Sequence, residues 1–352
     1  MSSDNSGIPL MKRSAVFFLL VIALNGLFVS GCTHRSLRPA RNQLAGLPAA
    51  IAADYTYTKS PATAVVQVSE EEAQYVLKRV RLPVAEDASP TNRWVELDFY
   101  QATTQGRAPV ILVLPMSGGG YSIERHFASY FASRGYSAAI VHRDKIPKAE
   151  QLIENLNPMM KRMVLDHKRV IDWLETQPRV AAQKIGIFGI SLGGIKGAIL
   201  TPLESRIQAA VLGLAGGDLP HILVHSTEPG LAKRRDAYLK EHHLTPEQAE
   251  AKLREMITRD PLAYAPYVDS KKVMLVIARF DTVVPTDKGL LLKEKMGNPE
   301  TIMLPTGHYT AVLSIPYIKS QAFSFFEKRF ADSAGPAINA RSSFTRTQAG
   351  KR

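Results

Sequence analysis

Cysteine is nearly absent from this chain, since Cys32 is the only one among 352 residues. A single cysteine excludes an internal disulfide. Long apolar runs are missing too: the stretch from Ala15 to Phe28 has 14 residues and is interrupted by Asn25 and Gly26, which is too short to span a bilayer comfortably. The hydrophobic content of 45% and the charged content of 22% are near those of globular proteins, which excludes a multi-span membrane protein and a largely disordered chain.

The excess of positive charge is not accompanied by a nucleic-acid-binding motif. The formal net charge is +12, and a basic balance by itself raises nucleic acid as a partner. The positive residues are scattered, however, and attraction to an anionic membrane surface is the simpler explanation of their local concentrations. We therefore expect no nucleic-acid partner. The concentrations are Arg35, Arg38 and Arg41 near one end and Arg341, Arg346, Lys351 and Arg352 at the other.

The N-terminus resembles a bacterial export signal. Lys12 and Arg13 precede the apolar stretch, as a basic n-region precedes the h-region of a secretory signal, and Met11 is an alternative start to Met1. The Val-Ser-Gly-Cys segment that ends at Cys32 resembles the bacterial lipobox, in which the cysteine is lipidated and becomes the first mature residue. A plain signal peptide with an incidental cysteine, or an uncleaved anchor helix, is the alternative.

The lipobox predicts the location and the organisation of the mature chain. A lipidated Cys32 would hold the protein at the bacterial cell envelope, and Thr33 in place of an aspartate resembles the outer-membrane sorting pattern of a Gram-negative cell, with the protein facing the periplasm. Residues 1–31 would then be the signal peptide, and the aperiodic residues 32–62 a tether. We expect a folded domain over residues 63–331 and a disordered tail over residues 332–352.

Apolar runs of strand length alternate with amphipathic stretches over the folded region. This alternation predicts an α/β fold with a mostly parallel central sheet flanked by helices. Two earlier segments have the pattern of antiparallel strands that open such sheets, and Pro316 should mark a break before the last helix. The expected parallel strands are 110–114, 136–141, 184–188, 209–214, 273–278 and 301–304, the antiparallel strands 74–82 and 94–100, and the helices 123–133, 159–176, 192–200 and 317–330.

The sharpest signal lies where the third parallel run meets a helix. The run from Lys184 to Gly194 contains Gly-Ile-Ser-Leu-Gly at 189–193, which matches the G-x-S-x-G nucleophile elbow. In such an elbow the serine occupies a strained strand-to-helix turn, and the two glycines let neighbouring backbone approach without a Cβ clash. The following helix directs its positive N-terminal end at the reacting centre. We therefore assign Ser191 as the nucleophile.

These segments together resemble the α/β-hydrolase superfamily, in the branch of dienelactone-hydrolase-like and acyl-esterase-like proteins. The resemblance extends from about Val65 to Phe330. It is carried by the elbow, by the Asp-Trp-Leu triplet at 172–174 in the helix before it, and by Arg-Phe-Asp-Thr-Val-Val-Pro at 279–285, which is similar to the acid loop of that branch. It implies an α/β-hydrolase fold whose chemistry requires neither a metal nor an organic cofactor.

An insertion of 58 residues separates the run ending at Leu214 from the run starting at Val273. It includes a charged helical stretch, Pro246–Arg259. In the fold that the chain resembles, an insertion at this point commonly caps the active site. We therefore expect a helical cap over residues 217–268, with a helical pair packed away from the site as the alternative.

A serine hydroxyl is a weak nucleophile at neutral pH, so it needs a positioned base and a group that holds the base. The family order is serine, acid, histidine, and His308 follows a late predicted strand. Asp281, 27 residues earlier, also follows a strand and is the expected acid. Asp287 is the alternative acid, although it falls where a helix should start, and stabilisation of a helix N-terminus explains it. Two histidines of the expected cap, His221 and His225, are candidates for substrate contact.

The tetrahedral intermediate of acyl transfer carries an oxyanion that needs preorganised donors. Leu192 follows the nucleophile and should donate one backbone N–H. The second should come from Leu-Pro-Met-Ser-Gly-Gly-Gly at 114–120, where the family has His-Gly-Gly-Gly; since the histidine is missing, Met116 is our first choice and Ser117 our second. A flexible glycine turn or a phosphate-binding loop is the alternative, but the segment lacks the lysine of a nucleotide P-loop.

The sequence therefore predicts a serine hydrolase that cleaves a carboxylic ester, or a related acyl bond, of a small-molecule acyl substrate through an acyl-enzyme on Ser191. Amides, thioesters and lactones fit the same three residues, so a peptidase, a thioesterase and a lactonase stay open. The alternative from another class is a non-catalytic lipoprotein that binds through this fold, and it predicts the loss of triad residues, which are all present. A dehalogenase needs a carboxylate at the elbow, which disfavours that chemistry.

Overall fold

The structure is a computed structural model that describes residues 46–59, 63–84, 93–118, 120–143 and 149–332. The predicted signal peptide, Cys32, the first part of the predicted tether and nearly all of the predicted tail lie outside these ranges. Within them, no helix combines the length and the apolar composition that crossing a membrane requires.

One sheet of nine strands runs through the described part of the chain, in the order β1-β2-β3-β5-β4-β6-β7-β8-β9. β1 to β3 pair antiparallel and β3 joins β5 antiparallel, whereas every pair from β5 across to β9 is parallel. The predicted mostly parallel sheet is confirmed. The strands are β1 (Val65–Glu71), β2 (Tyr75–Pro83), β3 (Trp94–Ala102), β4 (Ala108–Leu114), β5 (Ser137–Val141), β6 (Val180–Ile190), β7 (Ile207–Gly213), β8 (Val273–Ala278) and β9 (Glu300–Leu304).

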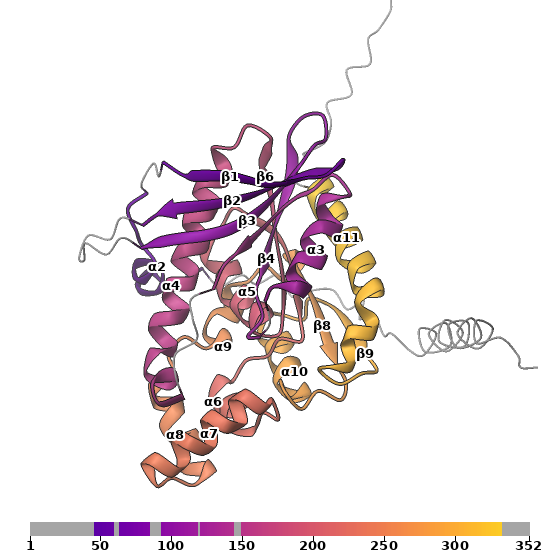
Figure 1. The fold of residues 1–352 in the computed structure, drawn as a ribbon. Coiled ribbons are helices and arrows are strands. Elements are labelled where there is room, and N and C mark those ends of the chain that lie inside the picture. The colour runs from indigo at the N-terminus through magenta and orange to yellow at the C-terminus, as the bar shows by residue number, and fades with distance from the viewer. Residues whose placement is uncertain (1–45, 60–62, 85–92, 119, 144–148, 333–352) are drawn as a thin grey trace, which may run out of the picture.

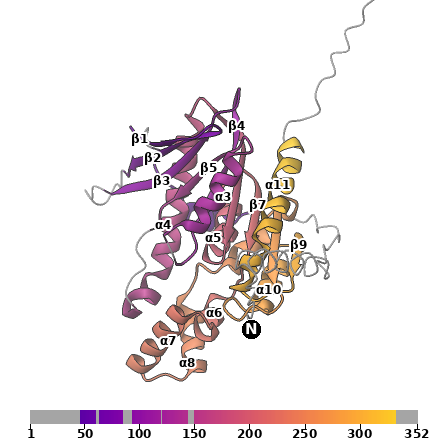
Figure 2. The same cartoon turned by 45° about the vertical axis from the view of Figure 1, so that its right-hand side comes forward.

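Helices cover both faces of the sheet. α4 (Ala149–Glu175), α5 (Leu192–Leu203) and α10 (Thr286–Lys295) contribute to the core on one face, and α3 (Ser122–Ala132) and α11 (Ile315–Asp332) to the core on the other. Figures 1 and 2 show α4 and α11 on opposite sides of the strands. The two cores arise because successive strand residues point to opposite faces, so that Leu112 enters the first core and Ile111 the second.

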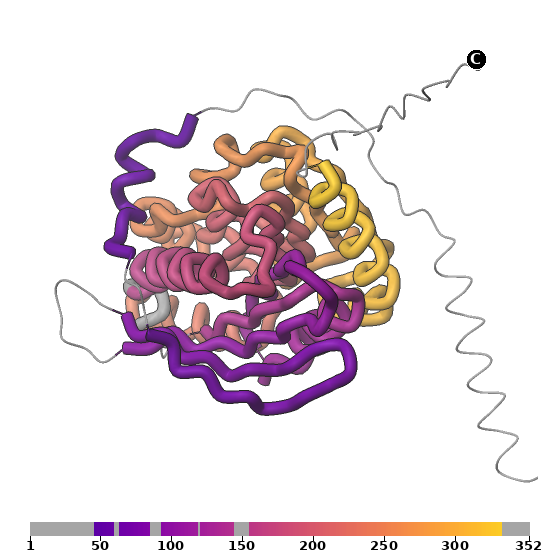
Figure 3. The backbone as a smooth tube through the Cα atoms, turned by 90° about the horizontal axis from the view of Figure 1, so that it is seen from above, coloured from indigo at the N-terminus to yellow at the C-terminus, as the bar shows by residue number. Residues whose placement is uncertain are grey.

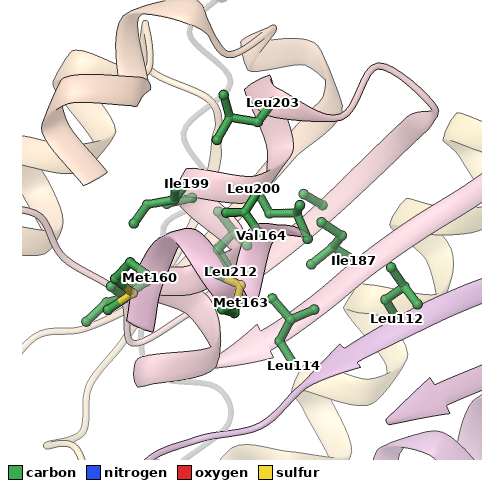
Figure 4. Close-up of a cluster of buried hydrophobic side chains, with 14 of the residues drawn as sticks. Leu112, Leu114, Met160, Met163, Val164, Ile187, Ile199, Leu200, Leu203 and Leu212 are labelled. Atoms are coloured by element: carbon green, nitrogen blue, oxygen red, sulfur yellow. The ribbon is translucent and has the colours of Figure 1, made fainter. Parts of the chain in front are cut away.

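The first core supports the turn between β6 and α5. Figure 4 shows Met160 and Val164 of α4 and Ile199 and Leu200 of α5 gathered over the strands. All four are at most 1% exposed. Burial of one such side chain stabilises a fold by roughly 1.5–3 kcal/mol, so α5, which follows the predicted nucleophile, is packed firmly against α4 and the sheet.

The insertion between β7 and β8 contains four helices: α6 (Leu219–His225), α7 (Pro229–His242), α8 (Pro246–Met256) and α9 (Pro261–Tyr264). Short 3₁₀ turns η1 (Ala265–Tyr267) and η2 (Ser270–Lys272) lead into β8, and η3 (Thr310–Ser314) precedes α11. Figure 1 shows α6, α7 and α8 at the lower end of the molecule, on the side to which the arrow of β8 points. The cap helices therefore lie beyond the carboxyl ends of the parallel strands.

The largest differences from the predicted elements concern α4, Pro316 and β1. α4 begins ten residues before the predicted start, with Pro158 inside it. The predicted break at Pro316 is wrong, because this proline lies in the first turn of α11, where a missing N–H removes no helical hydrogen bond. β1 was not predicted; all of its residues are exposed, so it lacks the alternation that marks a half-buried strand.

The predicted tether does not extend over residues 46–59, which include the helix α2 (Ala49–Asp54) and contact the folded body through Tyr55 and Tyr57. Tyr55 is 1% exposed, and its hydroxyl hydrogen-bonds with that of Tyr264 at 2.7 Å. Tyr57 donates a hydrogen bond to Asp172 at 2.5 Å. The buried aromatic surface offsets the entropy cost of ordering this segment. Figure 3 shows α2 on the side of the molecule opposite to α11.

Candidate active site

Ser191 occupies the turn between β6 and α5. Its φ of 56° and ψ of −124° put a non-glycine residue in a backbone conformation that costs about 1–3 kcal/mol. A Cβ on Gly189 would stand 2.4 Å from the carbonyl oxygen of Gly193, and a Cβ on Gly193 would stand 2.2 Å from that of Leu114. Both distances are impossible for real atoms, so the turn closes only with glycine at these two positions. The sequence pattern of the elbow therefore has the steric origin that we expected.

The structure brings Ser191, His308 and Asp281 together. His308 Nε2 is 3.1 Å from Ser191 Oγ, and His308 Nδ1 is 2.7 Å from Asp281 Oδ2. When Nδ1 carries the proton and donates it to the carboxylate, Nε2 is left as an acceptor facing the hydroxyl. This arrangement can remove the proton from the serine as its oxygen attacks.

Backbone groups hold Asp281 in position. Its Oδ1 accepts the N–H groups of Val283 and Val284, each at 2.9 Å, which leaves Oδ2 for the histidine. The Asp281 side chain is only 2% exposed. The N–H of Phe280 donates to the carbonyl oxygen of Thr306 at 2.9 Å, so the loops after β8 and β9 are tied together just before they present the acid and the histidine.

The alternative acid, Asp287, lies elsewhere. It stands in the first turn of α10, its side chain is 68% exposed, and it pairs with Lys288 at 3.2 Å. A carboxylate in the first turn of a helix interacts favourably with the helix dipole. Stabilisation of the N-terminus of α10 therefore explains the position of Asp287, as we expected from the sequence.

The loop after β4 favours Ser117 over Met116 as the second oxyanion donor, which reverses the predicted order. The N–H of Met116 donates to Glu124 Oε1 at 2.8 Å, and Glu124 is buried in the first turn of α3. This contact argues against Met116, our first choice, because its donor is already used by a carboxylate. Ser117 is exposed and lines the same cavities as Ser191, while Leu192 is the first residue of α5. Sequence reasoning missed Glu124, since nothing in the local pattern pairs it with the loop.

Two largely apolar cavities open on Ser191. The core cavity, of about 230 Å³, lies toward the sheet and α11 and includes His308 in its wall. The cap cavity, of about 270 Å³, lies under α6 and α7. Ser117, Gly118 and Glu228 border both. The core cavity is further lined by Phe188, Val211, Val276, Ile315 and Ile318, and the cap cavity by Met160, Leu219, Ile222, Leu223, Leu231 and Arg234.

Residues of α6 and α7 thus form one wall of a cavity that reaches the nucleophile. The predicted cap over the site is confirmed, and the alternative of a helical pair packed away from it is excluded.

Charged groups fix the point where the cap leaves the sheet. Asp218 precedes α6 and pairs with Arg254 of α8 at 2.8 Å and with Lys288 of α10 at 3.1 Å. Burial alone would raise the pKa of Asp218, but the hydrogen bonds from Arg254 and Lys288 outweigh burial and hold that pKa below its usual value. Asp260 accepts backbone N–H groups at the starts of α6 and α9, and burial raises its pKa.

Three other histidines have clear surroundings. His167 of α4 is wholly buried, its Nδ1 lies 2.8 Å from the carbonyl oxygen of Met163, and burial lowers its pKa to about 4. His221 and His225, which we considered for substrate contact, face Glu250 of α8 instead, and neither is among the described residues that line the two cavities.

A family model matches part of the chain. Residues 97–213, from β3 through the elbow to β7, match the dienelactone hydrolase family. Uncharacterized proteins from two Mycobacterium tuberculosis strains are each 29% identical over 148 residues, which is 41% of this chain and 32% of theirs. The chain therefore spans about a third of the length of these curated relatives.

Solved structures resemble the whole fold. An acetyl xylan esterase from a Paenibacillus species superposes with a TM-score of 0.61 at 17% identity, covering 80% of this chain and 100% of that one. Acetyl xylan esterase 1 from a Thermoanaerobacterium species gives 0.57 at 13% identity, covering 78% and 99%. A glucuronoyl esterase from Teredinibacter turnerae gives 0.53 at 12% identity, covering 82% and 81%. At such identities the likeness establishes the fold.

Proposed function

We propose that this protein is a serine hydrolase of carboxylic esters. The premises are its α/β-hydrolase fold and the match of residues 97–213 to the dienelactone hydrolase family. One observation carries the proposal: His308 lies 3.1 Å from Ser191 Oγ on one side and 2.7 Å from Asp281 Oδ2 on the other. A hydroxyl, an imidazole and a buried carboxylate in this order are the parts that nucleophilic acyl transfer needs.

Acylation starts with attack of Ser191 Oγ on the ester carbonyl carbon. The serine proton passes to His308 Nε2, and Asp281 stabilises the imidazolium that forms. The N–H groups of Leu192 and Ser117 donate to the oxyanion of the tetrahedral intermediate. Collapse of the intermediate breaks the bond to the alcohol oxygen, which takes the proton from Nε2 and departs, so the acyl group stays on Oγ.

Deacylation repeats these steps with water as the nucleophile. His308 removes a proton from the water that attacks the acyl carbon, and Ser191 Oγ is the leaving group that recovers the proton. The free acid then departs. No step requires a metal or an organic cofactor.

The cavities indicate how the substrate lies. The alcohol must receive its proton from His308, and His308 borders the core cavity but is not among the residues that line the cap cavity. We therefore place the alcohol portion in the core cavity and the acyl portion in the cap cavity. Since both walls are mainly apolar, the substrate is an ester with apolar groups on either side of the bond.

Ser191→Ala tests the proposed function. A fluorophosphonate probe should label the wild type and not the variant, and turnover of p-nitrophenyl acetate should fall by at least about 10³-fold because the nucleophile is gone. His242→Gln, an exposed change at the end of α7, is the matched control and should keep full turnover. A folded Ser191→Ala protein with unchanged turnover would exclude the mechanism, and a wild type that neither labels nor turns over would favour a binding module.

We also propose that Cys32 is lipidated and anchors this hydrolase at the bacterial cell envelope. Acyl chains contribute about 0.8 kcal/mol per buried CH₂, so several chains on one cysteine make release slow. Cys32→Ser should move the protein to the soluble fraction with its specific activity retained, and the intact mass of the mature protein should start at residue 32 with acyl additions. An unmodified Cys32, or a variant that stays on the membrane after a high-salt wash, would contradict the proposal.

A further inference from the structure

A compact cluster of imidazole and carboxylate groups joins α6 to α8. His221 Nδ1 and His225 Nε2 lie 3.3 Å and 2.9 Å from the same oxygen, Glu250 Oε2. The ligand atoms of all three side chains lie within 4.8 Å of one another. The four-residue spacing puts both imidazoles on one face of α6, and their ring centroids are 4.2 Å apart.

The separations fit a shared metal ion. Zinc holds nitrogen and oxygen ligands at about 2.0–2.1 Å in a tetrahedron, which puts the ligand atoms about 3.3 Å from one another. The two separations from Glu250 Oε2 are close to this value. Small rotations of the side chains would be enough to seat the ion.

Arg254 completes the surroundings of Glu250. The other oxygen of Glu250, Oε1, accepts a hydrogen bond from Arg254, so only Oε2 faces the two rings. Two imidazole nitrogens and a carboxylate oxygen this close together are ligands that a divalent transition metal commonly takes. The bond from Arg254 then orients the carboxylate, as outer partners of metal ligands commonly do.

We propose that His221, His225 and Glu250 bind one Zn²⁺, with a fourth position open to water. Two imidazoles and a carboxylate favour zinc over magnesium or calcium, which prefer all-oxygen sites. The His225 side chain is 42% exposed, so an ion can enter from solvent.

The ion would fix a wall of the cap cavity. The face of α6 opposite to the two histidines carries Leu219, Ile222 and Leu223, which line that cavity. A metal that joins α6 to α8 would therefore limit the motion of this wall without contacting the catalytic residues. This proposal does not depend on the ester-hydrolase function.

Zinc titration of the full chain tests the site, in a Cys32→Ser background that removes the only thiol. Calorimetry should give one equivalent of bound Zn²⁺, and MgCl₂ should give no binding. His221→Gln, His225→Gln and Glu250→Gln should each weaken zinc binding by at least about 10-fold, because each removes one of three ligands. His308→Gln and His242→Gln are the matched controls and should bind as the parent does.

Two further measurements keep the test decisive. Co²⁺ bound to the parent protein should give the visible absorption of a tetrahedral site, and the His221→Gln, His225→Gln double variant should lose it. Zinc should raise the thermal midpoint of the parent but not that of the double variant, with circular dichroism showing that both are folded. No binding to the parent, binding that persists in the double variant, or binding that only His308→Gln removes would overturn the proposal.

Discussion

The catalytic residues and the outer helices of the cap differ in how much apolar packing surrounds them. β8, which precedes Asp281, is buried along its whole length, and the last residues of β6 before Ser191 are almost all buried. In the cap, α7 buries only Tyr238 and α8 only Ala249 and Leu253. The cap is joined to the body through α6, which buries Leu219, Pro220, Ile222 and Val224, and through the charged contacts of Asp218 with Arg254 and Lys288.

This difference in packing indicates that one part of the site carries out the reaction and another part selects the substrate. Apolar packing on both sides of a sheet gives the few tenths of an ångström of precision that a proton transfer needs. Helices that bury only one or two side chains, as α7 and α8 do, open more readily than strands that are packed on both faces. We infer that the catalytic centre is the rigid part of the site and that the cap wall is the adjustable part.

The largest expected effect concerns the catalytic centre. Asp281→Asn should lower kcat/KM for p-nitrophenyl acetate by about 10³–10⁴-fold, because an amide cannot hold the imidazole in the required tautomer or stabilise its charged form. Asp287→Asn removes the same charge from α10 and should leave the rate unchanged. Steady-state kinetics of both variants, with circular dichroism to check folding, tests this prediction. An equal fall of kcat/KM in both variants, or a fall only in Asp287→Asn, would contradict the assignment of Asp281 as the acid.

A second prediction concerns stability in mild acid and rests on a buried histidine of the body. His167 has a pKa of about 4 in the folded protein and the ordinary value of 6.5 when unfolded. The unfolded state therefore binds the proton more tightly, so this residue contributes stability that is complete above pH 6.5 and is lost as the pH falls through 4. The loss is at most about 3 kcal/mol.

His167→Gln gives the comparison for this effect, because it removes the titration at the same buried position. Chemical unfolding followed between pH 7 and pH 4 should show a smaller pH dependence in the variant than in the wild type. Identical pH profiles for the two proteins would show that another group causes the loss of stability in acid.

A third and smaller effect should appear in the cap alone. Asp260→Ala removes an acceptor from backbone N–H groups at the starts of α6 and α9, which should cost roughly 2 kcal/mol. Hydrogen exchange should become faster in those two helices and stay unchanged in β6 and α5. Asp236→Ala, an exposed change on α7, is the control. Faster exchange in β6 as well would mean that the cap and the catalytic body open together.

The sequence was most informative where neighbouring residues determine the structure. The strand 273–278 was predicted with its observed bounds, because six consecutive apolar residues between polar ones are typical of a buried parallel strand. The elbow was equally clear, since its glycines have a steric role that can be read from five residues. Family order then selected Asp281 and His308, which the structure places in hydrogen-bonding contact.

Contacts between distant residues were not predictable in this way. Tyr55 and Tyr264 are 209 positions apart, so the packing of the supposed tether has no local signal. The bond from Met116 to Glu124 depends on how the loop turns into α3, and our order of oxyanion donors missed it. The exposed strand β1 is joined to β2 by backbone hydrogen bonds, and its side chains give no pattern from which this pairing could be predicted.

The smallest expected effect would test which cavity holds which half of the ester. Leu223→Trp narrows the cap cavity from α6, and Ile315→Trp narrows the core cavity from the start of α11; both positions are partly buried, so each can accept a larger ring. Leu223→Trp should lower kcat/KM for p-nitrophenyl octanoate about 10-fold relative to the acetate, a difference of about 1.4 kcal/mol, since the acyl chain lies under the cap. Ile315→Trp should leave the ratio of kcat/KM for p-nitrophenyl octanoate to that for the acetate unchanged. It should lower kcat/KM for octyl acetate relative to ethyl acetate by a similar factor of about 10. If the two variants exchanged these effects, the alcohol would lie under the cap and the acyl chain in the core, and the adjustable wall would select the leaving group.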